Sequence, residues 1–177
     1  MFIRNGCESD ISNILHLIKD SYAPYRDLMG DISIPAYTFE EINSLLNEPQ
    51  SDVWVAEDNG IIVGMAAGTV FGPCAYHLKM LFVSGKKQHQ GIGNQLLARF
   101  ENRAWERHFS LLTVNYLEWA EWSRHFYKKH GFREYVQKDE ETCNDIKSQA
   151  AFLKEIGRLN NGDKHLLWKR TAEKVVS

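Results

Sequence analysis

Apolar residues recur at helical spacing near the start of the chain, with polar residues between them. They are Ile11, Ile14, Leu15 and Ile18. This spacing predicts an amphipathic helix that begins near residue 10, where Ser9 or Asp10 can cap the first turn. A second, shorter helix is predicted after Thr38, because Glu41 three residues later completes a capping-box pattern. Residues 22–37, which are polar and aromatic, are expected to form a loop between the two helices.

The middle of the chain contains apolar runs that are typical of strands. Residues 53–57 and 61–71 form two such runs, separated by Asp58, Asn59 and Gly60. An Asn-Gly pair supplies the positive φ angles of a type I′ turn, so the two runs predict a β-hairpin. The apolar run 76–83 predicts the next strand, and the pattern that follows predicts a helix over residues 91–108.

The remaining elements follow from the same patterns. They are a strand at 110–115, a helix near 120–130 closed by Gly131, a strand at 132–136, a helix at 144–156, a turn at 160–163 and a final strand at 165–170. Helices thus come first, then consecutive strands, then an alternation of strands and helices. This order predicts a mixed α/β fold of the α+β kind, with one mixed sheet and flanking helices.

Length and composition favour one compact domain. The 177 residues, of which 44% are hydrophobic, suit the core of a single domain, and we expect residues 1–177 to form one. The 21 basic and 23 acidic residues are spread along the chain, which argues against a nucleic-acid-binding face. No apolar run approaches the ~18 residues that span a bilayer, and the N-terminus does not resemble a signal peptide, so no membrane association is expected.

The three cysteines are Cys7, Cys74 and Cys143. Their odd number and wide spacing suit neither a disulfide framework nor a metal site, so we expect no metal and a reducing, cytoplasmic setting.

Two glycines one residue apart, Gly91 and Gly93, stand where the strand at 76–83 passes into a helix. Unpaired N–H groups and the positive end of the helix dipole at such a point attract anions, and a missing Cβ lets phosphate oxygens approach closely. The alternative is a pair of glycines that only ease a tight turn. A dinucleotide fingerprint would need a glycine or alanine where the chain has Leu96, and a P-loop would need Gly-Lys-Ser/Thr, so both nucleotide motifs are excluded.

The segment "MLFVSGKKQHQGIG" resembles the central signature of the GNAT superfamily of N-acetyltransferases, a strand followed by Gln/Arg-x-x-Gly-x-Gly/Ala at the start of a helix. Gln88, Gly91 and Gly93 occupy the signature positions. The segment "WSRHFYKKHGF" is similar to a second motif of the superfamily, through Phe126, Tyr127, Gly131 and Phe132. The resemblance covers roughly residues 2–136, and the opening "FIRNGCESDISNIL" is also similar to the N-termini of this superfamily. Residues 138–177 then form a C-terminal extension beyond the common core that supplies the last helix and strand.

The resemblance implies a central, mostly antiparallel sheet with a splayed strand pair and acetyl-CoA as the acetyl donor, released as CoA. The strands near 77–83 and 110–115 would splay and receive the cofactor. The resemblance implies that the backbone of residues 81–83, at the end of the first of these strands, pairs with the pantetheine arm. The N–H groups of residues 88–93 would hold the pyrophosphate. The cofactor-binding residues so implied are Leu81, Phe82, Val83, Gln88, His89, Gln90, Gly91, Ile92, Gly93, Asn94, Ser123 and Tyr127. Lys86, Lys87 and His89 would add positive charge near the phosphates. The alternative for these residues is an ordinary solvated loop, which fits each lysine equally well.

Tyr127 and His77 are the catalytic residues that the resemblance implies. A phenol with a pKa of ~10 at the motif position of Tyr127 can protonate the departing thiolate. His77 lies six residues before Val83, where related enzymes carry a glutamate base, and an imidazole can accept a proton from an ammonium group. A packed aromatic residue and a strand-end histidine are the structural alternatives. Glu118 is a weaker candidate for the base.

Two positions depart from the motif. Many relatives carry Asn and Ala seven and four residues before the motif tyrosine, where this chain has Ala120 and Ser123. The missing amide removes a hydrogen bond to the cofactor arm, and the Ser123 hydroxyl is a candidate substitute. This departure keeps a second hypothesis open, a catalytically weak CoA-binding or regulatory module, beside an enzyme that acetylates a primary amine of a small molecule or peptide by direct transfer.

The pocket for the acceptor amine is expected from the loop after the first helix and from the neighbouring strands. Its expected residues are Tyr22, Tyr25, Arg26, Asp31, His77, Lys79 and 115–119. Trp119 and Trp122 are spaced for one side of a helix, which fits core packing or a homodimer contact.

Overall fold

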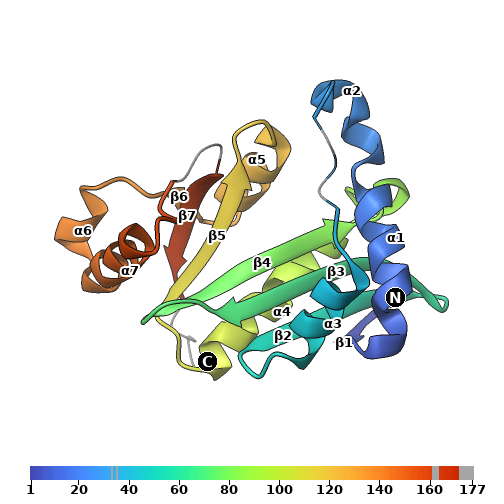
Figure 1. The fold of residues 1–177 in the computed structure, drawn as a ribbon, viewed down its shortest axis with the longest axis horizontal. Helices are drawn as coiled ribbons and strands as arrows, with labels where there is room; N and C mark the ends of the chain where they lie inside the picture. Colours follow the sequence, from blue (N-terminus) through green and yellow to red (C-terminus); the bar gives the residue numbers. More distant parts are fainter. Residues whose placement is uncertain (33, 35, 161–163, 172–177) are drawn as a thin grey trace. The chain divides into compact units, whose positions relative to one another are not determined.

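The computed structural model describes residues 1–32, 34, 36–160 and 164–171. The chain divides into two compact units, one made of Met1–Thr69 and Lys79–Phe100 and the other of Val70–Leu78 and Glu101–Ser177. Among the described residues, seven strands form a sheet in the order β1-β2-β3-β4-β5-β7-β6. Strand β4 (Ala75–Val83) contributes residues to both units. The mixed α/β class with a mostly antiparallel sheet and flanking helices is thus confirmed (Figure 1).

The strands of the first unit form antiparallel neighbours. Strand β1 (Phe2–Asn5) pairs with β2 (Ser51–Asp58), which pairs with β3 (Ile61–Val70). Asn59 and Gly60 have φ angles of 51° and 79°, so the predicted type I′ hairpin is confirmed. The prediction that helices come first was wrong, because β1 precedes them. Its four residues are exposed or half-buried, which leaves no apolar alternation to detect.

The helices of the first unit begin close to their predicted positions. They are α1 (Ile11–Ser21), α3 (Phe39–Asn47) and α4 (Ile92–Glu106), of which the residues from Glu101 onward belong to the second unit. The Thr38–Glu41 capping box of α3 is confirmed. The loop predicted at 22–37 contains the 3₁₀ turn η2 (Ala23–Tyr25) and the short helix α2 (Arg26–Met29), which correct that prediction; residues 33 and 35 lie outside the described part.

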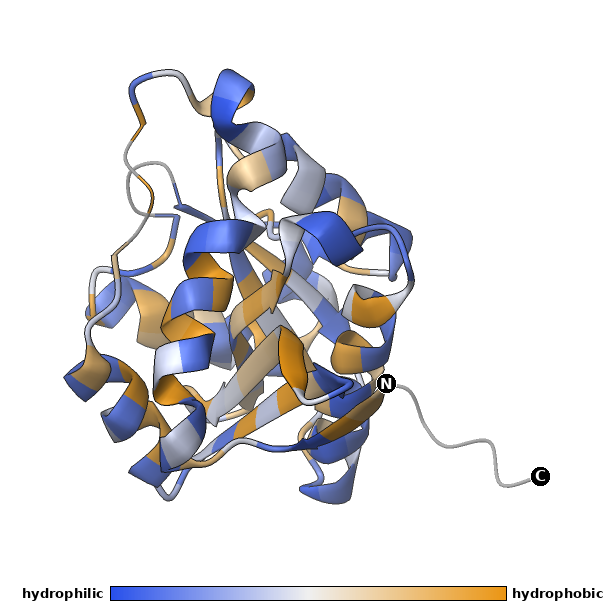
Figure 2. Ribbon diagram, turned by 90° about the vertical axis from the view of Figure 1, so that its right-hand side faces the viewer, coloured by the Kyte–Doolittle hydropathy of each residue, from blue (hydrophilic) through white to orange (hydrophobic). Residues whose placement is uncertain are grey.

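Helices cover both faces of the sheet in this unit. Helices α1 and α3 share one apolar core with β2, β3 and Met80 of β4. On the opposite face, a Cβ added to Gly64 of β3 would lie 2.9 Å from both Ile92 and Leu96 of α4, so only glycine admits the helix this close. Figure 2 shows the matching alternation of hydrophobic and hydrophilic residues along the helices.

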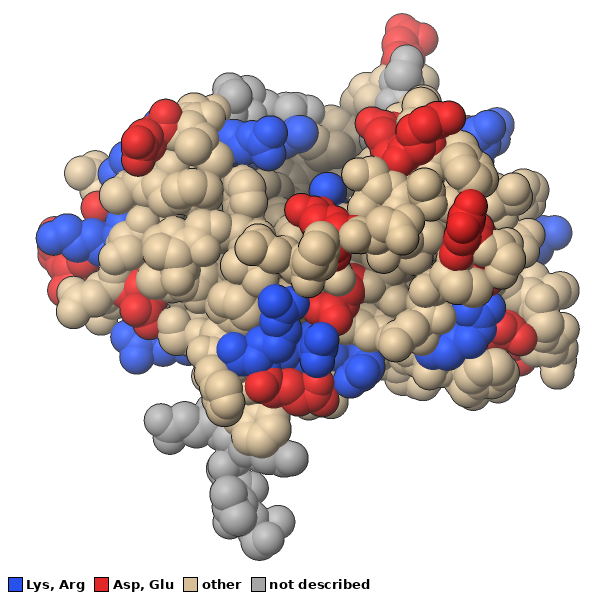
Figure 3. All heavy atoms as spheres, turned by 60° about the horizontal axis from the view of Figure 1, so that its bottom comes forward, with Lys and Arg blue, Asp and Glu red and all other residues tan. Residues whose placement is uncertain are grey.

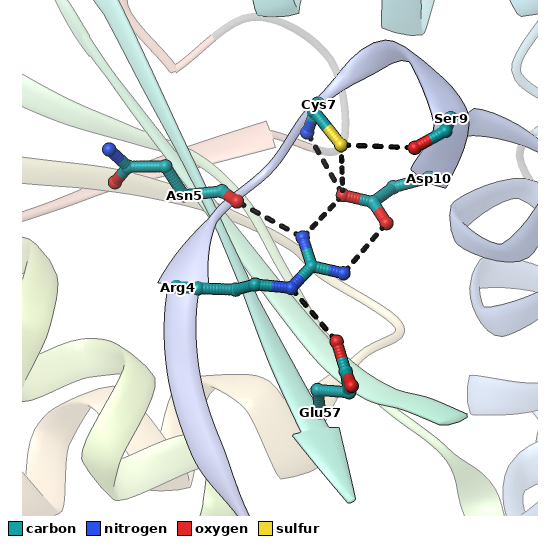
Figure 4. Close-up of polar contacts among 6 residues, drawn as sticks. All are labelled: Arg4, Asn5, Cys7, Ser9, Asp10 and Glu57. Atoms are coloured by element: carbon teal, nitrogen blue, oxygen red, sulfur yellow. Dashed lines mark hydrogen bonds and ion pairs between the residues drawn. The ribbon is translucent and has the colours of Figure 1, made fainter. Parts of the chain in front are cut away.

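A polar cluster ties β1 to the start of α1 (Figure 4). The Arg4 guanidinium donates to both carboxylate oxygens of Asp10, at 2.7 and 2.9 Å, and its Nε donates to Glu57 of β2 at 2.8 Å. The same Asp10 carboxylate accepts from the Cys7 N–H at 2.9 Å, closing the 3₁₀ turn η1 (Glu8–Asp10). The side chain of Asp10 therefore caps η1, and not α1 as predicted.

The second unit is built around β5 (Leu111–Leu117). Strand β5 runs parallel to the Ala75–Leu78 part of β4 and antiparallel to β7 (Lys164–Arg170), which pairs in turn with β6 (Arg133–Glu134). Its helices are α5 (Glu121–Lys129), α6 (Asp139–Thr142) and α7 (Asn144–Glu155). Gly131 follows α5 with a φ of 84°, as predicted for its last turn.

Two predictions for the second unit need correction. The strand predicted at 132–136 is reduced to two residues, and α6 was not predicted. Of the turn predicted at 160–163, only Asn160 lies in the described part, with a φ of 45°. Within that part, no helix is long and apolar enough to cross a bilayer.

We predict that Asp10→Asn lowers the free energy of unfolding by roughly 2 to 3 kcal/mol at pH 7, because it leaves the Arg4 guanidinium without its charged partner. The Arg4 hydrogen bonds lower the pKa of Asp10 from 3.8 to about 2. Wild-type stability should therefore be complete above pH ~4 and lose about 2 kcal/mol as the pH falls from 4 to 2, a dependence that Asp10→Asn should flatten.

Urea denaturation at pH 7, 4 and 2.5 measures both effects. Glu8→Gln, which removes an exposed carboxylate two residues away, is the matched control. Equal stabilities of the Asp10 and Glu8 variants at all three pH values would contradict the assigned role of the cluster.

Candidate active site

The turn between β4 and α4 leaves the helix N-terminus open. Helix α4 begins at Ile92, and the Gln95 N–H donates to the Gly91 carbonyl at 3.1 Å, so Gly91 lies just outside the helix and Gly93 inside its first turn. Gly91 has a φ of 83°, and His89 before it also has a positive φ, 61°. By helix geometry, the N–H groups of Ile92, Gly93 and Asn94 have no partner within the helix. Donors for an anion are therefore available here.

Empty space adjoins Gly91. A Cβ added to Gly91 would meet no atom of the described protein within 4 Å, whereas one added to Gly85 of the same turn would lie 2.9 Å from the Asp20 carbonyl and from Pro24. Gly85 is thus explained by close packing against the end of α1. The left-handed backbone at position 91 accounts for the glycine there, and the space beside it is open to a ligand.

The Gln88 side chain holds this turn in place. Its Nε2 donates to the Ser21 carbonyl at 2.8 Å and to the Val83 carbonyl at 3.1 Å, while its Oε1 accepts from the Tyr25 hydroxyl at 2.8 Å. The Asp20 carboxylate adds bonds from the Ser84 hydroxyl at 2.6 Å and the Gly85 N–H at 3.0 Å. Gln88, expected to bind the cofactor, therefore directs its side chain into the protein, and only its backbone N–H suits the expected role.

The basic residues of the turn differ in their contacts. Lys87 forms an ion pair with Asp58 at 3.0 Å, and this contact lowers the pKa of the Asp58 carboxyl. Lys86, His89 and Gln90 are exposed, and the Gln90 amide donates to the Lys86 carbonyl at 3.2 Å. Figure 3 shows acidic and basic side chains interspersed on the face that it draws.

Strand β4 ends in residues that are half-buried, namely Leu81, Phe82 and Val83. The parallel pairing of β4 with β5 covers Ala75–Leu78 and Leu111–Val114. The Phe82 ring packs against Tyr22 and Tyr37, with ring centroids 6.0 and 6.3 Å away. Burial and the neighbouring Tyr37 raise the pKa of Tyr22 to about 12.

Tyr127 lies in α5 of the second unit and is 7% exposed. Its ring contacts Phe126 and Phe132 edge-on or tilted, at centroid distances of 5.3 and 5.8 Å. The Tyr127 carbonyl accepts from the N–H groups of His130 and Phe132, which fixes the end of the helix. The Tyr127 ring is thus held between two neighbouring aromatic rings on a helix with a well-defined end.

His77 lies on β4, also in the second unit, and is half-buried. Its Nδ1 is 3.0 Å from the Thr113 hydroxyl on the paired residue of β5, and its ring packs on Phe71 with a centroid distance of 5.4 Å. A histidine held on both sides in this way has a defined ring orientation.

Of the other residues that the sequence singled out in and before α5, Ser123, Trp119 and Trp122 form contacts within the protein. The Ser123 hydroxyl donates to the Ala120 carbonyl at 2.9 Å, so it can offer a cofactor only its acceptor lone pairs. Glu118 is exposed. Trp119 and Trp122 pack against each other with a centroid distance of 5.6 Å.

A cavity of about 350 Å³ lies in the first unit between α3 and β4. Its lining residues are Tyr37, Glu40, Glu41, Ser44, Leu45, Glu48, Lys79 and Met80. Of the residues expected around the acceptor, only Lys79 lines it, while Tyr25 is bonded to Gln88. The three glutamates were missed because their spacing on α3 is that of an ordinary solvated helix face. Within the described part, no three His, Cys, Asp or Glu side chains are grouped so that they could hold a metal ion.

Comparison with known proteins identifies the class. The fold is that of CoA-dependent acetyltransferases: residues 49–134 match the family model "Acetyltransferase (GNAT) domain". Residues 49–134 therefore match a GNAT domain, and the resemblance that the two motifs indicated is confirmed. No curated protein matches the sequence significantly.

Solved structures share the fold at low identity. PaiA N-acetyltransferase of Thermoplasma acidophilum, in complex with coenzyme A, is 14% identical and superimposes with a TM-score of 0.75 over 96% of this chain and 98% of its own. The ribosomal-protein-S18-alanine N-acetyltransferase of Escherichia coli is 14% identical, with a TM-score of 0.68 over 99% and 98%. The ribosomal-protein-alanine N-acetyltransferase of Brucella melitensis is 21% identical, with a TM-score of 0.66 over 96% and 99%.

We predict that Gln88→Ala loosens the turn between β4 and α4. It removes three hydrogen bonds, two of them to backbone carbonyls, so the equilibrium constant for local opening should rise about 10-fold or more. Hydrogen exchange of the amides of residues 84–92 measures this. Gln90→Ala, which removes one exposed bond, is the control; equal exchange in both variants would show that Gln88 does not hold the turn.

Proposed function

We propose that the protein is an acetyl-CoA-dependent N-acetyltransferase that moves an acetyl group to a primary amine of a small molecule or peptide by direct transfer. The observation that carries this proposal is the open N-terminus of α4 directly after β4, with Gly91 facing empty space. We take both units together as one acetyltransferase domain, in which residues 138–177 add α6, α7 and β7.

The donor set fits the phosphates of CoA. The backbone N–H groups of residues 88–94 would hold the pyrophosphate at the positive end of the α4 dipole, and exposed Lys86 and His89 would add charge. The backbone of Leu81, Phe82 and Val83 would pair with the pantetheine arm in the manner of an added strand. When bound, acetyl-CoA supplies the activated thioester; the protein supplies orientation, proton donors and proton acceptors.

Two side chains are assigned to proton transfer. Tyr127 donates its phenolic proton to the departing thiolate, and its tight packing against Phe126 and Phe132 supports this role by fixing the hydroxyl. His77 accepts the proton of the acceptor ammonium group, directly or through water. The contact of its Nδ1 with Thr113 orients the ring for that role.

The acceptor is proposed to be an amine, which is positively charged before it reacts. The cavity between α3 and β4 carries Glu40, Glu41 and Glu48 against one Lys79, a balance that attracts a cation. Two of the structural neighbours are named for acetylation of a ribosomal protein, which supports a peptide acceptor as one alternative beside a small amine.

Thiol release from acetyl-CoA in the presence of amines, amino acids, polyamines and peptides tests the function. Acceptor-dependent release is the expected result. Tight CoA binding without release for any acceptor would instead favour a CoA-binding module, and the absence of both would overturn the proposal.

We predict that Gly91→Ala weakens CoA binding at least ~10-fold, because the added Cβ enters the space reserved for the phosphates. Gly60→Ala is a matched control: Gly60 has a φ of 79°, close to the 83° of Gly91, and its added Cβ also meets nothing within 4 Å. Both variants should lose about 1 kcal/mol of stability from backbone strain. Isothermal calorimetry that finds equal CoA affinity for the two variants would refute the cradle.

We predict that Tyr127→Phe lowers kcat about 100-fold near pH 7 and leaves acetyl-CoA affinity nearly unchanged, because the ring and its packing remain while the transferable proton is lost. The effect should shrink towards pH 9, since a thiol with a pKa of ~8.5 then leaves without protonation. The comparison of kcat across pH 6 to 9 measures this, with Tyr135→Phe as a control for loss of a phenol elsewhere. An unchanged kcat at every pH would remove Tyr127 from the mechanism.

A further inference from the structure

A buried glutamine of α7 contacts the turn between β3 and β4. Gln149 is 0% exposed, and its Nε2 donates to the Phe71 carbonyl at 2.8 Å. Its Oε1 is buried without a hydrogen-bond partner within the described residues. A buried amide with one unsatisfied atom costs stability that an apolar residue of similar size would not. Core packing alone therefore does not account for this residue.

The turn is shaped to meet Gln149. Gly72 has a φ of 83°, and an added Cβ there would lie 2.5 Å from the Gln149 Oε1 and 2.8 Å from the Phe152 ring. The Phe71 N–H donates to the Ala75 carbonyl at 3.1 Å, which closes the turn on the other side. The position of Phe71 is thus set through its carbonyl by Gln149 and through its N–H by β4.

The Phe71 ring lies between α7 and His77. It contacts Phe152 of α7 edge-on at 5.5 Å and the His77 ring at 5.4 Å, and the Arg158 guanidinium lies 5.9 Å over it. On the far side of the turn, the His77 Nδ1 meets Thr113 at 3.0 Å. Gln149, Phe71, His77 and Thr113 therefore form one continuous chain of contacts within the second unit.

We propose that Gln149 is a positioning residue for His77: it fixes Phe71 through the carbonyl, and the Phe71 ring then sets the orientation of the imidazole. The catalytic importance of this chain rests on the proposed function, whereas the mechanical link itself does not. The extension that carries α7 then acts on the proton-accepting group. Gln149 lies outside residues 49–134, the region that matches the family model, whereas Phe71 and His77 lie inside it.

The test is Gln149→Met, which keeps the volume of the side chain and removes its hydrogen-bonding groups. The readout is the His77 imidazole resonance in long-range proton–nitrogen spectra, assigned with a His77→Gln variant. In the wild type the Phe71 ring current should displace the His77 ring protons, and Gln149→Met should move them towards the values of an exposed histidine. If Gln149→Met does not fold, Gln149→Leu, which also lacks the amide, should give the same shift.

Ile146→Val is the matched control. Ile146 is a buried residue of α7 that packs in the apolar cluster with Ala75, Leu111 and Trp168. Its truncation loosens the packing of the same helix without removing a hydrogen bond. His77 resonances that stay unchanged in Gln149→Met, or that move equally in Ile146→Val, would overturn the proposal.

A second readout separates this inference from the proposed function. With an acceptor in hand, Gln149→Met should lower kcat about 10-fold with unchanged KM for acetyl-CoA, as expected for a misplaced proton acceptor. An inactive wild-type protein would contradict the proposed function alone, because the imidazole spectra need no turnover.

Discussion

The left-handed backbone of Gly91 is the constraint on which the candidate site depends. With a φ of 83°, it turns the chain from β4 into α4, and a Cβ added there would meet no atom of the described residues within 4 Å. Any other residue would add strain of about 1 to 2 kcal/mol and fill that space with a Cβ. The anion binding that we propose for this turn would thus depend on the backbone more than on the surrounding side chains.

The rest of the first unit holds this turn still. Gln88 and Asp20 bind the turn to the end of α1, and Arg4 with Asp10 binds the start of α1 to the sheet. Helix α1 therefore joins two polar anchors, one at each end, across an apolar core that it shares with β2 and β3. A site that depends on several backbone N–H groups needs this rigidity, because their positions must be fixed before the ligand arrives.

The sequence predicted those features that short-range chemistry determines. The Thr38–Glu41 capping box and the Asn59-Gly60 turn each depend on residues within a few positions, and both were predicted correctly. The glycine pair and the Phe126-Tyr127 motif likewise identified the fold through local patterns. Strand β1 was missed because a short half-buried edge strand has no periodicity.

Features that depend on distant partners were not predictable from the sequence. The sequence expectation for Gln88 concerned its backbone N–H, and it gave no role to the side chain, which binds Ser21 and Tyr25 more than 60 positions earlier. The bond between Gln149 and Phe71 spans 78 positions, and neither residue stands out in the sequence. The glutamates near Lys79 are brought to one cavity only by the packing of α3 against the sheet.

The most direct measurement of the central claim is a titration of the nitrogen-15-labelled protein with CoA, followed through its backbone amides. The account predicts that the largest shifts fall on residues 88–94, with smaller shifts at 81–83. Pantetheine, which lacks the pyrophosphate, should lose the first set of shifts and keep the second. Shifts confined to other parts of the chain, or none at millimolar CoA, would contradict it.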